Sequence, residues 1–328
     1  MKQINWGIIG CGDVTEVKSG PAFNKVANSS LVAVMRRDAA KAADYAARHG
    51  VPAWYNQADQ LLNDPDVNAI YIATPPDSHE AYTLEALKSG KPVYVEKPMS
   101  LTEASCLRML EAASKYGTKL TVAHYRRALP LFNKVKELLA AGAIGKVLFV
   151  KIDILQPAKN GIAVDMENNW RIDPAISGGG LFHDLAPHHL DIMIWLFGPL
   201  KSGHGYSANQ SGASQADDIV TGELLFANGV LCQGVWCFHV PAAESKDSCV
   251  IMGSQGKIEF SFHKDQCRLV KGNETEEYTL KSPAHIQQPM IEQVVRYFRG
   301  EGPNPCPAED GATVLRIMDT FTLSKPLL

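Results

Sequence analysis

Short apolar runs alternate with stretches of helical spacing through the first part of the chain. The runs predict strands at residues 4–9, 31–35, 68–73 and 119–123, and a short strand at the start of the stretch 93–100. Between them, Asp38 precedes an alanine-rich stretch that Gly50 ends, and Ser100 and Glu103 are spaced as a helix capping box. Five alternations of strand and helix predict an α/β fold with a parallel, doubly wound sheet over residues 1–123.

The pattern changes in the second part of the chain. Helical spacing at 130–140 is followed by a long strand pattern at 146–155, and further strand-like runs lie at 219–226, 229–239, 248–252, 257–262 and 267–270. Links such as Asn228-Gly229 are short, which indicates antiparallel pairing. Helical spacing at 286–299 and 311–323 closes the chain. We therefore predict a second domain over residues 124–328, of the α+β class. Because few helices are available to cover its sheet, a second subunit is the expected cover, in a homodimer or homotetramer.

Composition adds mainly exclusions. The 328 residues favour two domains, and a net charge of −3 provides no broad field for nucleic acid or an anionic membrane. No apolar run approaches the roughly 18 residues of a membrane span, and the chain enters a strand pattern directly, so we expect a cytoplasmic protein. The seven cysteines contain no Cys-x-x-Cys pair, which argues against a disulfide framework or a structural zinc site.

A glycine-rich turn follows the first predicted strand. It reads Gly10-Cys11-Gly12-Asp13-Val14, with Thr15 where the dinucleotide-binding fingerprint has its third glycine. Such glycines let the backbone turn tightly and approach a pyrophosphate, which rests on the next helix's amino terminus. The alternative is a plain strand-to-helix turn. The surrounding strand and helix alternation favours the dinucleotide site.

The residues at the end of the second predicted strand indicate which of the two nicotinamide cofactors is bound. An acidic residue there would bind the ribose of NAD, whereas arginine accommodates the 2′-phosphate of NADP. This chain has Arg36 and Arg37 before Asp38. We expect NADP(H) to be preferred, with NAD(H) possible. In the alternative, the arginines only solvate a helix entrance and Asp38 reaches the ribose.

One lysine lies at the end of the short strand that begins at Val93. Pro98 prevents that strand from continuing as a hydrogen-bonded ladder, so Lys97 sits at its carboxyl end, the edge where open α/β sheets bind ligands. The alternative is an ordinary surface lysine.

A second candidate cluster lies on the helix predicted over 181–197, after a glycine triplet that we expect to act as a flexible hinge. Asp184 and His188 are four residues apart and share a face, and Asp191 falls within about 20° of Asp184. A metal site would also need His183 and His189, whose side chains point elsewhere on the helix. We therefore predict no metal site. A second alternative is a dipole-favoured aspartate beside a buried structural histidine.

Four motifs together resemble one known family. They are Gly7-Ile8-Ile9-Gly10-Cys11-Gly12, Thr74-Pro75-Pro76-x-x-His79, Glu96-Lys97-Pro98, and Gly178-Gly179-Gly180-x-x-x-Asp184-x-x-x-His188-x-x-Asp191. In order and spacing they resemble the glucose-fructose oxidoreductase, inositol dehydrogenase and rhizopine-catabolism family. The resemblance implies an amino-terminal Rossmann domain followed by a domain with a large, mostly antiparallel open sheet that commonly serves in oligomerisation.

The resemblance also implies an activity: hydride transfer between a nicotinamide and a secondary alcohol or carbonyl of a sugar, inositol or related polyol. His188 suits the role of base because its unperturbed pKa of about 6.5 is near working pH. Asp184 would orient it, and the positive charge of Lys97 would stabilise a developing alkoxide. Related enzymes use the corresponding lysine, aspartate and histidine in this way.

Further residues follow from the resemblance. Thr74, Pro75, Pro76 and His79 are expected on the nicotinamide side of the cofactor with Glu96 nearby; Tyr125 and Arg126 are expected to face the substrate, and Trp170 and Arg171 to form a loop over the cofactor. Trp170 could equally be a hydrophobic anchor and Arg171 a salt-bridge partner.

Two other functions are known among similar proteins. One is redox-neutral sugar conversion with a retained cofactor, and the other is a non-catalytic regulator that senses a dinucleotide. The presence of both Lys97 and His188 argues against the regulator. The redox-neutral enzymes tend to have longer chains with export signals, which are not seen in this sequence, so we expect a dehydrogenase or reductase.

Overall fold

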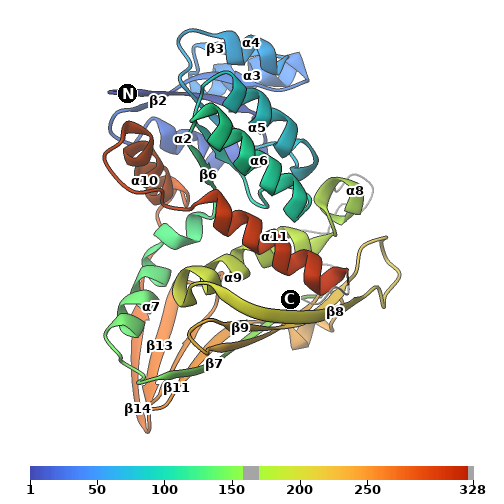
Figure 1. Ribbon diagram of the computed structural model, residues 1–328, viewed down its shortest axis with the longest axis vertical. Coiled ribbons are helices and arrows are strands. Elements are labelled where there is room, and N and C mark those ends of the chain that lie inside the picture. The colour runs from blue at the N-terminus through green and yellow to red at the C-terminus, as the bar shows by residue number, and fades with distance from the viewer. Residues whose placement is uncertain (158–169, 324–328) are drawn as a thin grey trace. The chain divides into compact units, whose positions relative to one another are not determined.

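The computed structural model describes residues 1–157 and 170–323 (Figure 1). The chain divides into two compact units. The first contains Met1–Ala128 and Pro283–Leu315, and the second contains Leu129–Ser282 and the chain from Arg316 onward. Among the helices of the described ranges, none is long and apolar enough to cross a membrane.

The first unit contains a six-stranded, all-parallel sheet in the order β3-β2-β1-β4-β5-β6. This order is the one shared by dinucleotide-binding Rossmann folds. Every residue of β4, β5 and β6 is buried, as expected for a parallel sheet covered on both faces. The strands are β1 (Ile4–Ile9), β2 (Ser29–Met35), β3 (Ala53–Tyr55), β4 (Ala69–Ile72), β5 (Val93–Val95) and β6 (Leu120–Val122).

The helices of the first unit begin and end largely where local signals predicted. Asp38 accepts a hydrogen bond from the Lys41 amide, and Gly50 ends the same helix with a left-handed conformation. The predicted cap at Ser100 is wrong, because Thr102 accepts the hydrogen bond from the Ser105 amide instead. The elements are α1 (Asp13–Val17), α2 (Gly20–Phe23), α3 (Ala39–His49), α4 (Ala58–Asn63), η1 (Pro76–Ser78), α5 (His79–Lys88), α6 (Glu103–Tyr116), η2 (Tyr125–Ala128), α10 (Gln288–Arg299) and the first part of α11 (Ala308–Thr322).

The compact units differ from the predicted domains in the placement of Pro283–Leu315. This segment packs with the first unit, although we expected all of 124–328 to form the second domain. The physical reason lies at the edge of the parallel sheet, where the Cys306 carbonyl accepts hydrogen bonds from the Val122 amide and the Thr121 hydroxyl. Asn304 adds a side-chain bond to the Leu120 carbonyl. An open strand edge thus finds its partners about 180 residues further along the chain.

The second unit contains an eight-stranded sheet in the order β14-β13-β12-β11-β7-β10-β9-β8. Its neighbouring strands pair antiparallel except for β7 and β10, which pair parallel. The strands are β7 (Val147–Leu155), β8 (Leu200–Ala208), β9 (Ile219–Phe226), β10 (Leu231–Cys237), β11 (Lys246–Gly253), β12 (Lys257–Phe260), β13 (Gln266–Lys271) and β14 (Glu274–Thr279). The remaining elements are α7 (Pro130–Ala140), η3 (Trp170–Ile172), α8 (Pro174–Ser177), α9 (Leu181–Phe197) and η4 (Ala242–Glu244).

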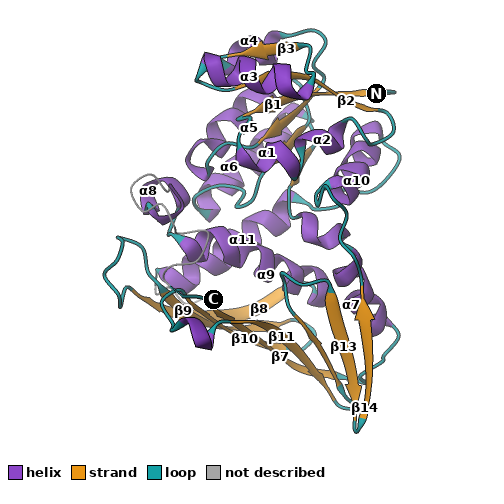
Figure 2. Cartoon of the chain, turned by 180° about the vertical axis from the view of Figure 1, so that it is seen from behind, coloured by secondary structure: helices purple, strands orange, loops and turns teal. Residues whose placement is uncertain are grey.

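The two faces of this second sheet differ. On one face, α9 and the end of α11 lie along the strands (Figure 2): the indole of Trp236 bonds to His189, and Phe321 fills the space above Gly205 and Gly222. On the other face, Phe149 and Leu231 are direct cross-strand neighbours and are 43% and 54% exposed. The helices therefore cover one face and leave apolar side chains on the other.

Candidate functional site

The glycine loop after β1 has the geometry of a dinucleotide-binding turn. Gly10 has a φ of +94°, and a Cβ there would lie 2.6 Å from Thr74 Cγ2, so only glycine fits. Thr15, at the third fingerprint position, is fully buried; its hydroxyl accepts from the Gly12 amide at 3.0 Å and donates to the Gly12 carbonyl at 2.7 Å. The amides of Asp13 and Val14 begin α1, so neither has an acceptor within that helix. They are the groups on which a pyrophosphate could rest.

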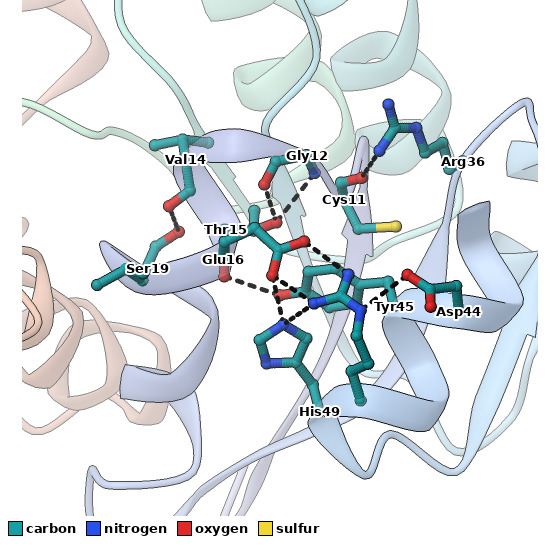
Figure 3. A network of polar contacts seen from close by, with 12 residues as sticks. Cys11, Gly12, Val14, Thr15, Glu16, Ser19, Arg36, Asp44, Tyr45 and His49 are labelled. Carbon is teal, nitrogen blue, oxygen red and sulfur yellow. Dashed lines mark hydrogen bonds and ion pairs between the residues drawn. The ribbon is translucent and has the colours of Figure 1, made fainter.

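The end of β2 presents the predicted arginines beside this loop. Figure 3 shows the Arg36 guanidinium reaching the carbonyl oxygen of Cys11, at 3.1 Å. Arg37 is exposed. The Asp38 carboxylate caps α3 through the Lys41 amide at 3.1 Å and forms an ion pair with the Lys41 ammonium at 3.7 Å. The Arg36 guanidinium therefore lies next to the loop, while the Asp38 carboxylate is engaged by its own helix.

The turn after β4 holds Thr74, Pro75, Pro76 and His79. Thr74 and Pro75 are partly exposed, whereas Pro76 and His79 are buried. The imidazole of His79 is wholly buried: Nε2 lies 2.7 Å from the Thr74 carbonyl oxygen and Nδ1 lies 2.9 Å from the Pro98 carbonyl oxygen. Burial lowers the pKa of this histidine, while the two carbonyl oxygens act in the opposite direction. His79 thus joins the end of β4 to the turn that follows Lys97.

Lys97 is set apart by its exposure. In the run from Pro92 to Ser100 it alone is not buried, so its side chain leaves the core at the carboxyl end of β5. Glu96, expected near the cofactor, is 5% exposed and points inward. Its carboxylate accepts hydrogen bonds from the Tyr71 hydroxyl at 2.5 Å and from the Lys97 amide at 3.1 Å. The carboxylate of Glu96 and both ring nitrogens of His79 therefore bond to protein groups of the neighbouring turns and strands.

Tyr125 and Arg126 follow β6 in the short helix η2. They are 7% and 6% exposed, and the guanidinium of Arg126 lies 5.7 Å from the centre of the Tyr125 ring. The adjacent Arg127 forms an ion pair with Asp310 at 2.9 Å, with its own side chain 4% exposed. Within the first unit, Lys97, Tyr125 and Arg126 thus follow the neighbouring strands β5 and β6 at the same sheet edge.

The other candidate residues lie in the second unit, on α9. The helix covers the predicted residues and contains Pro187, which cannot donate to the His183 carbonyl one turn earlier. Asp184 retains 14% side-chain exposure, His188 is 6% exposed and Asp191 is 1% exposed. The polar residues of this face are therefore partly exposed at the start of the helix and buried towards its middle.

The two other histidines of α9 are structural. The Nδ1 atom of His189 accepts from the indole of Trp236 at 2.9 Å, and its ring packs on Phe262 with centroids 4.3 Å apart. His183 is 3% exposed, and burial lowers its pKa to about 4, so it is neutral near pH 7. In the described part of the chain, no group of three His, Cys, Asp or Glu side chains is arranged to hold a metal ion.

The glycine triplet, which we expected to act as a flexible hinge, is hydrogen-bonded to the preceding turn. The amides of Gly179 and Gly180 donate to the Ser177 hydroxyl at 3.3 and 2.8 Å. A Cβ at Gly179 would lie 2.2 Å from the His183 ring, and Gly178 and Gly180 have φ of +90° and +77°. Each position requires glycine for its conformation or for a close approach, and the turn fixes the start of α9.

Arg171 forms an ion pair with Asp184: its Nε lies 3.3 Å from Oδ2, and its guanidinium stacks 4.6 Å from the Trp170 ring centre. The predicted alternative of a salt-bridge partner is confirmed for Arg171. Trp170 and Arg171, expected to form a loop over the cofactor, lie in the short helix η3, and their contact with a cofactor stays a prediction.

Two residues that contact the Lys97 turn escaped the sequence analysis, namely Tyr71 and Gln287. Gln287 donates to the Glu96 carboxylate at 2.7 Å from 191 residues away. No local pattern could have linked these positions.

Comparison with known proteins agrees with this architecture. The family model described as "Oxidoreductase family, NAD-binding Rossmann fold" matches residues 4–124, and the "GFO/IDH/MocA C-terminal domain" matches residues 132–259. The chain is 48% identical to Oxidoreductase P35 of Formosa agariphila, over 97% of this chain and 98% of the relative. It is 26% identical to a 1,5-anhydro-D-fructose reductase of Ensifer adhaerens, over 77% and 74% of the two chains.

The solved structures share the fold. An aldose-aldose oxidoreductase from Caulobacter crescentus, complexed with glycerol, superposes with a TM-score of 0.85 at 22% identity, covering 97% of this chain and 96% of that one. The two family models together match most of the sequence. They agree with the observed architecture, in which a glycine loop at the carboxyl ends of a parallel sheet is followed by a largely antiparallel sheet. The chain belongs to the Gfo/Idh/MocA family of NAD-binding oxidoreductases.

Proposed function

We propose that this oxidoreductase transfers a hydride between a nicotinamide cofactor and a secondary alcohol or carbonyl of a sugar, inositol or related polyol. The observation that carries the proposal is the position of Lys97 at the carboxyl edge of a parallel sheet. It is partly exposed in an otherwise buried run, in the same unit as the glycine loop. The names of the relatives, which include an anhydrofructose reductase and an inositol 2-dehydrogenase, support this substrate class.

The catalytic roles are assigned to three side chains. His188 removes the hydroxyl proton during oxidation and returns it during reduction, and Asp184 orients the imidazole. The Lys97 ammonium stabilises negative charge on the substrate oxygen. The bound nicotinamide supplies the site that accepts or gives the hydride. Arg171 keeps the Asp184 carboxylate in an ion pair near the start of α9.

Several further residues are assigned to binding. Gly10, Cys11 and Gly12 form the turn that admits the pyrophosphate, and Asp13 and Val14 bind it through their backbone amides. Thr74, Pro75 and Pro76 line the nicotinamide side. Trp170 and Arg171 cover the cofactor, while Tyr125 and Arg126 contact the substrate. The buried His79 and Glu96 act indirectly, through the backbone of the turns that they hold.

NADP(H) is the preferred cofactor in this proposal. Arg36 is anchored beside the loop through Cys11, and Arg37 is exposed next to it, so both cations are available to a 2′-phosphate. Asp38 is already the cap of α3 and is therefore a poor candidate for the ribose of NAD.

The activity is tested by screening sugars, inositols and their ketones with NADPH and NADP, and then comparing Lys97→Met with the wild type. We expect the kcat of the variant to fall about 10²–10³-fold, the usual loss when an electrostatic stabiliser is removed. Lys88→Met, which removes an exposed lysine at the end of α5, is the matched control and should leave kcat unchanged. A Lys97→Met enzyme with normal kcat would contradict the assignment.

The open sheet face is proposed to form a homodimer or homotetramer interface. One row of cross-strand neighbours on this face contains Met252, Phe149, Leu231 and Leu225, from β11, β7, β10 and β9. Such a contiguous apolar row is costly to leave in water. Leu231→Arg should lower the mass measured by light scattering to that of a monomer. Leu107→Arg, at a 51% exposed leucine on α6, should not change it. An unchanged mass for Leu231→Arg would rule out this face as the interface.

A further inference from the structure

Gln287 is a fully buried amide in the segment that returns to the first unit. Its side chain is 0% exposed, and its Nε2 donates to Oε1 of Glu96 at 2.7 Å. Its own Oε1 accepts from the Tyr94 hydroxyl at 3.4 Å, and its backbone amide donates to the Lys18 carbonyl at 3.1 Å. Gln287 is therefore fixed at both backbone and side chain, with its amide aimed at one carboxylate.

That carboxylate joins three parts of the chain. Oε1 of Glu96 accepts from the Tyr71 hydroxyl of β4 and from Gln287, which immediately precedes α10. Oε2 accepts from the backbone amide of Lys97 at 3.1 Å. A buried carboxylate is costly unless its oxygens are hydrogen-bonded, so removal of one donor disturbs the bonds to the others.

The third bond concerns the reaction. The Lys97 amide is held by Glu96 at the point where the chain leaves β5, and Lys97 is the residue of this run that leaves the core. An ammonium group acts on a reacting oxygen only from a correct position, and a misplacement of about 1 Å can cost about 100-fold in rate. The bond from Glu96 therefore fixes the backbone position from which the Lys97 side chain extends.

We propose that Gln287 and Glu96 are positioning residues for Lys97, and that the segment 283–315 thereby completes the catalytic edge of the first unit. The inference rests on the proposed role of Lys97. It assigns to a distant part of the chain an effect on kcat that is exerted through Glu96 and the Lys97 backbone.

The chain offers a matched pair of glutamines for the test. Gln287→Leu removes the donor to Glu96 while keeping a side chain of similar size, and Gln288→Leu alters the partly exposed neighbour at the start of α10. We expect Gln287→Leu to lower kcat about 10- to 100-fold, with the Kd for NADPH changed less than about twofold. Gln288→Leu should change neither. Equal kcat for the two variants would overturn the proposal.

A double-mutant cycle separates positioning from general damage. In a Lys97→Met background, Gln287→Leu should cause no further loss of kcat, because the group it positions is already gone. A merely structural role would lower kcat by the same factor in both backgrounds. If Gln287→Leu fails to fold, Tyr71→Phe removes the other donor to Oε1 without removing the ring, and the same non-additivity is expected.

A readout without substrate keeps the two proposals distinct. Hydrogen exchange at the Lys97 amide should accelerate in Gln287→Leu. The amides of β4, which lies two strands in from the edge strand β6, should keep their wild-type rates. Unchanged exchange at Lys97 would overturn the positioning role even in an active enzyme. If exchange at Lys97 accelerates but Lys97→Met retains full kcat, the positioning is real and the catalytic role of Lys97 fails instead.

Discussion

The two sheets of this protein use their faces differently. In the parallel sheet, β4 to β6 are buried at every residue, so chemistry is confined to the carboxyl edge, where Lys97 leaves the core. In the mostly antiparallel sheet, one face is covered by α9, which carries Asp184 and His188, and the other exposes Phe149 and Leu231. A sheet covered on both faces offers an edge for function, whereas a half-covered sheet offers a whole face.

The sharpest test of this difference compares Ile72→Ala in β4 with Leu231→Ala in β10. Ile72 is fully buried, so its truncation should cost about 2–5 kcal/mol of unfolding free energy. Leu231 is 54% exposed, so its truncation in the monomer should stay within about 0.5 kcal/mol. Hydrogen exchange resolved by peptide reports each unit separately in one chain. A large, concentration-dependent loss for Leu231→Ala would instead indicate that a partner covers this face.

A partly buried carboxylate of the second unit, Asp247, should give the next largest effect. Asp247 accepts from the Ser261 hydroxyl, the His263 ring and the amides of Phe262 and His263, at 2.6–3.0 Å. Burial opposes its charge, but these bonds lower its pKa well below the ordinary value. Asp247→Asn presents an amide to these donors and should cost about 1–3 kcal/mol at pH 7.

The sign of the pH dependence follows from that lowered pKa. The stabilisation is complete above the unfolded pKa of about 3.9 and is lost as the pH falls toward the folded value. Denaturant unfolding of the second unit at pH 7 and near pH 2 should therefore show a larger gap between wild type and Asp247→Asn at pH 7. A gap that does not shrink in acid would contradict the charged role.

The carboxyl edge of the parallel sheet is tested through cofactor choice. Arg36→Asp should lose about 1.4 kcal/mol or more of the preference for NADPH over NADH, a tenfold ratio of Kd. The titration follows energy transfer from tryptophan to the bound nicotinamide. Asp38→Asn, which alters the neighbouring cap instead, should leave the ratio in place. A wild type that binds NADH more tightly would contradict the assignment of Arg36.

The smallest effect is expected at the surface of the first unit. Glu16 accepts hydrogen bonds from two guanidinium nitrogens of Arg48, each at 2.8 Å, and lies 2.8 Å from the His49 ring, which Figure 3 shows beside it. The bonds to Arg48, with help from His49, lower the pKa of Glu16 to about 2 against the opposing effect of burial. Because the group is one-third exposed, Glu16→Gln should cost less than about 1 kcal/mol.

That cost should be present above about pH 4.5 and should fade as the pH drops toward 2, since the pKa is depressed in the folded protein. Thermal melts of the first unit across this range, with and without added salt, measure it. A cost that grows in acid would contradict the sign.

Much of the first unit could be predicted from local pattern. The apolar runs, Asp38, Gly50 and the glycine loop are short-range signals, and each lies where it was expected. The short elements β3 and α4 were missed. β3 has only three residues, none of them buried, and α4 has six residues and no side-chain cap. In the second unit β8 and β14 were missed; β14 is exposed at nearly every position and so lacks an apolar face.

The residue types of the candidate site could be recognised from local patterns, because glycine at a turn, lysine after a strand, and aspartate and histidine four apart on a helix are short-range features. Which distant side chains support these residues followed from the folded chain alone. Gln287 contacts Glu96 across 191 residues, and Arg171 pairs with Asp184 across a turn whose glycines are fixed by Ser177. Hydrogen bonds and burial are satisfied in three dimensions, and a linear pattern carries no record of which distant group satisfies them.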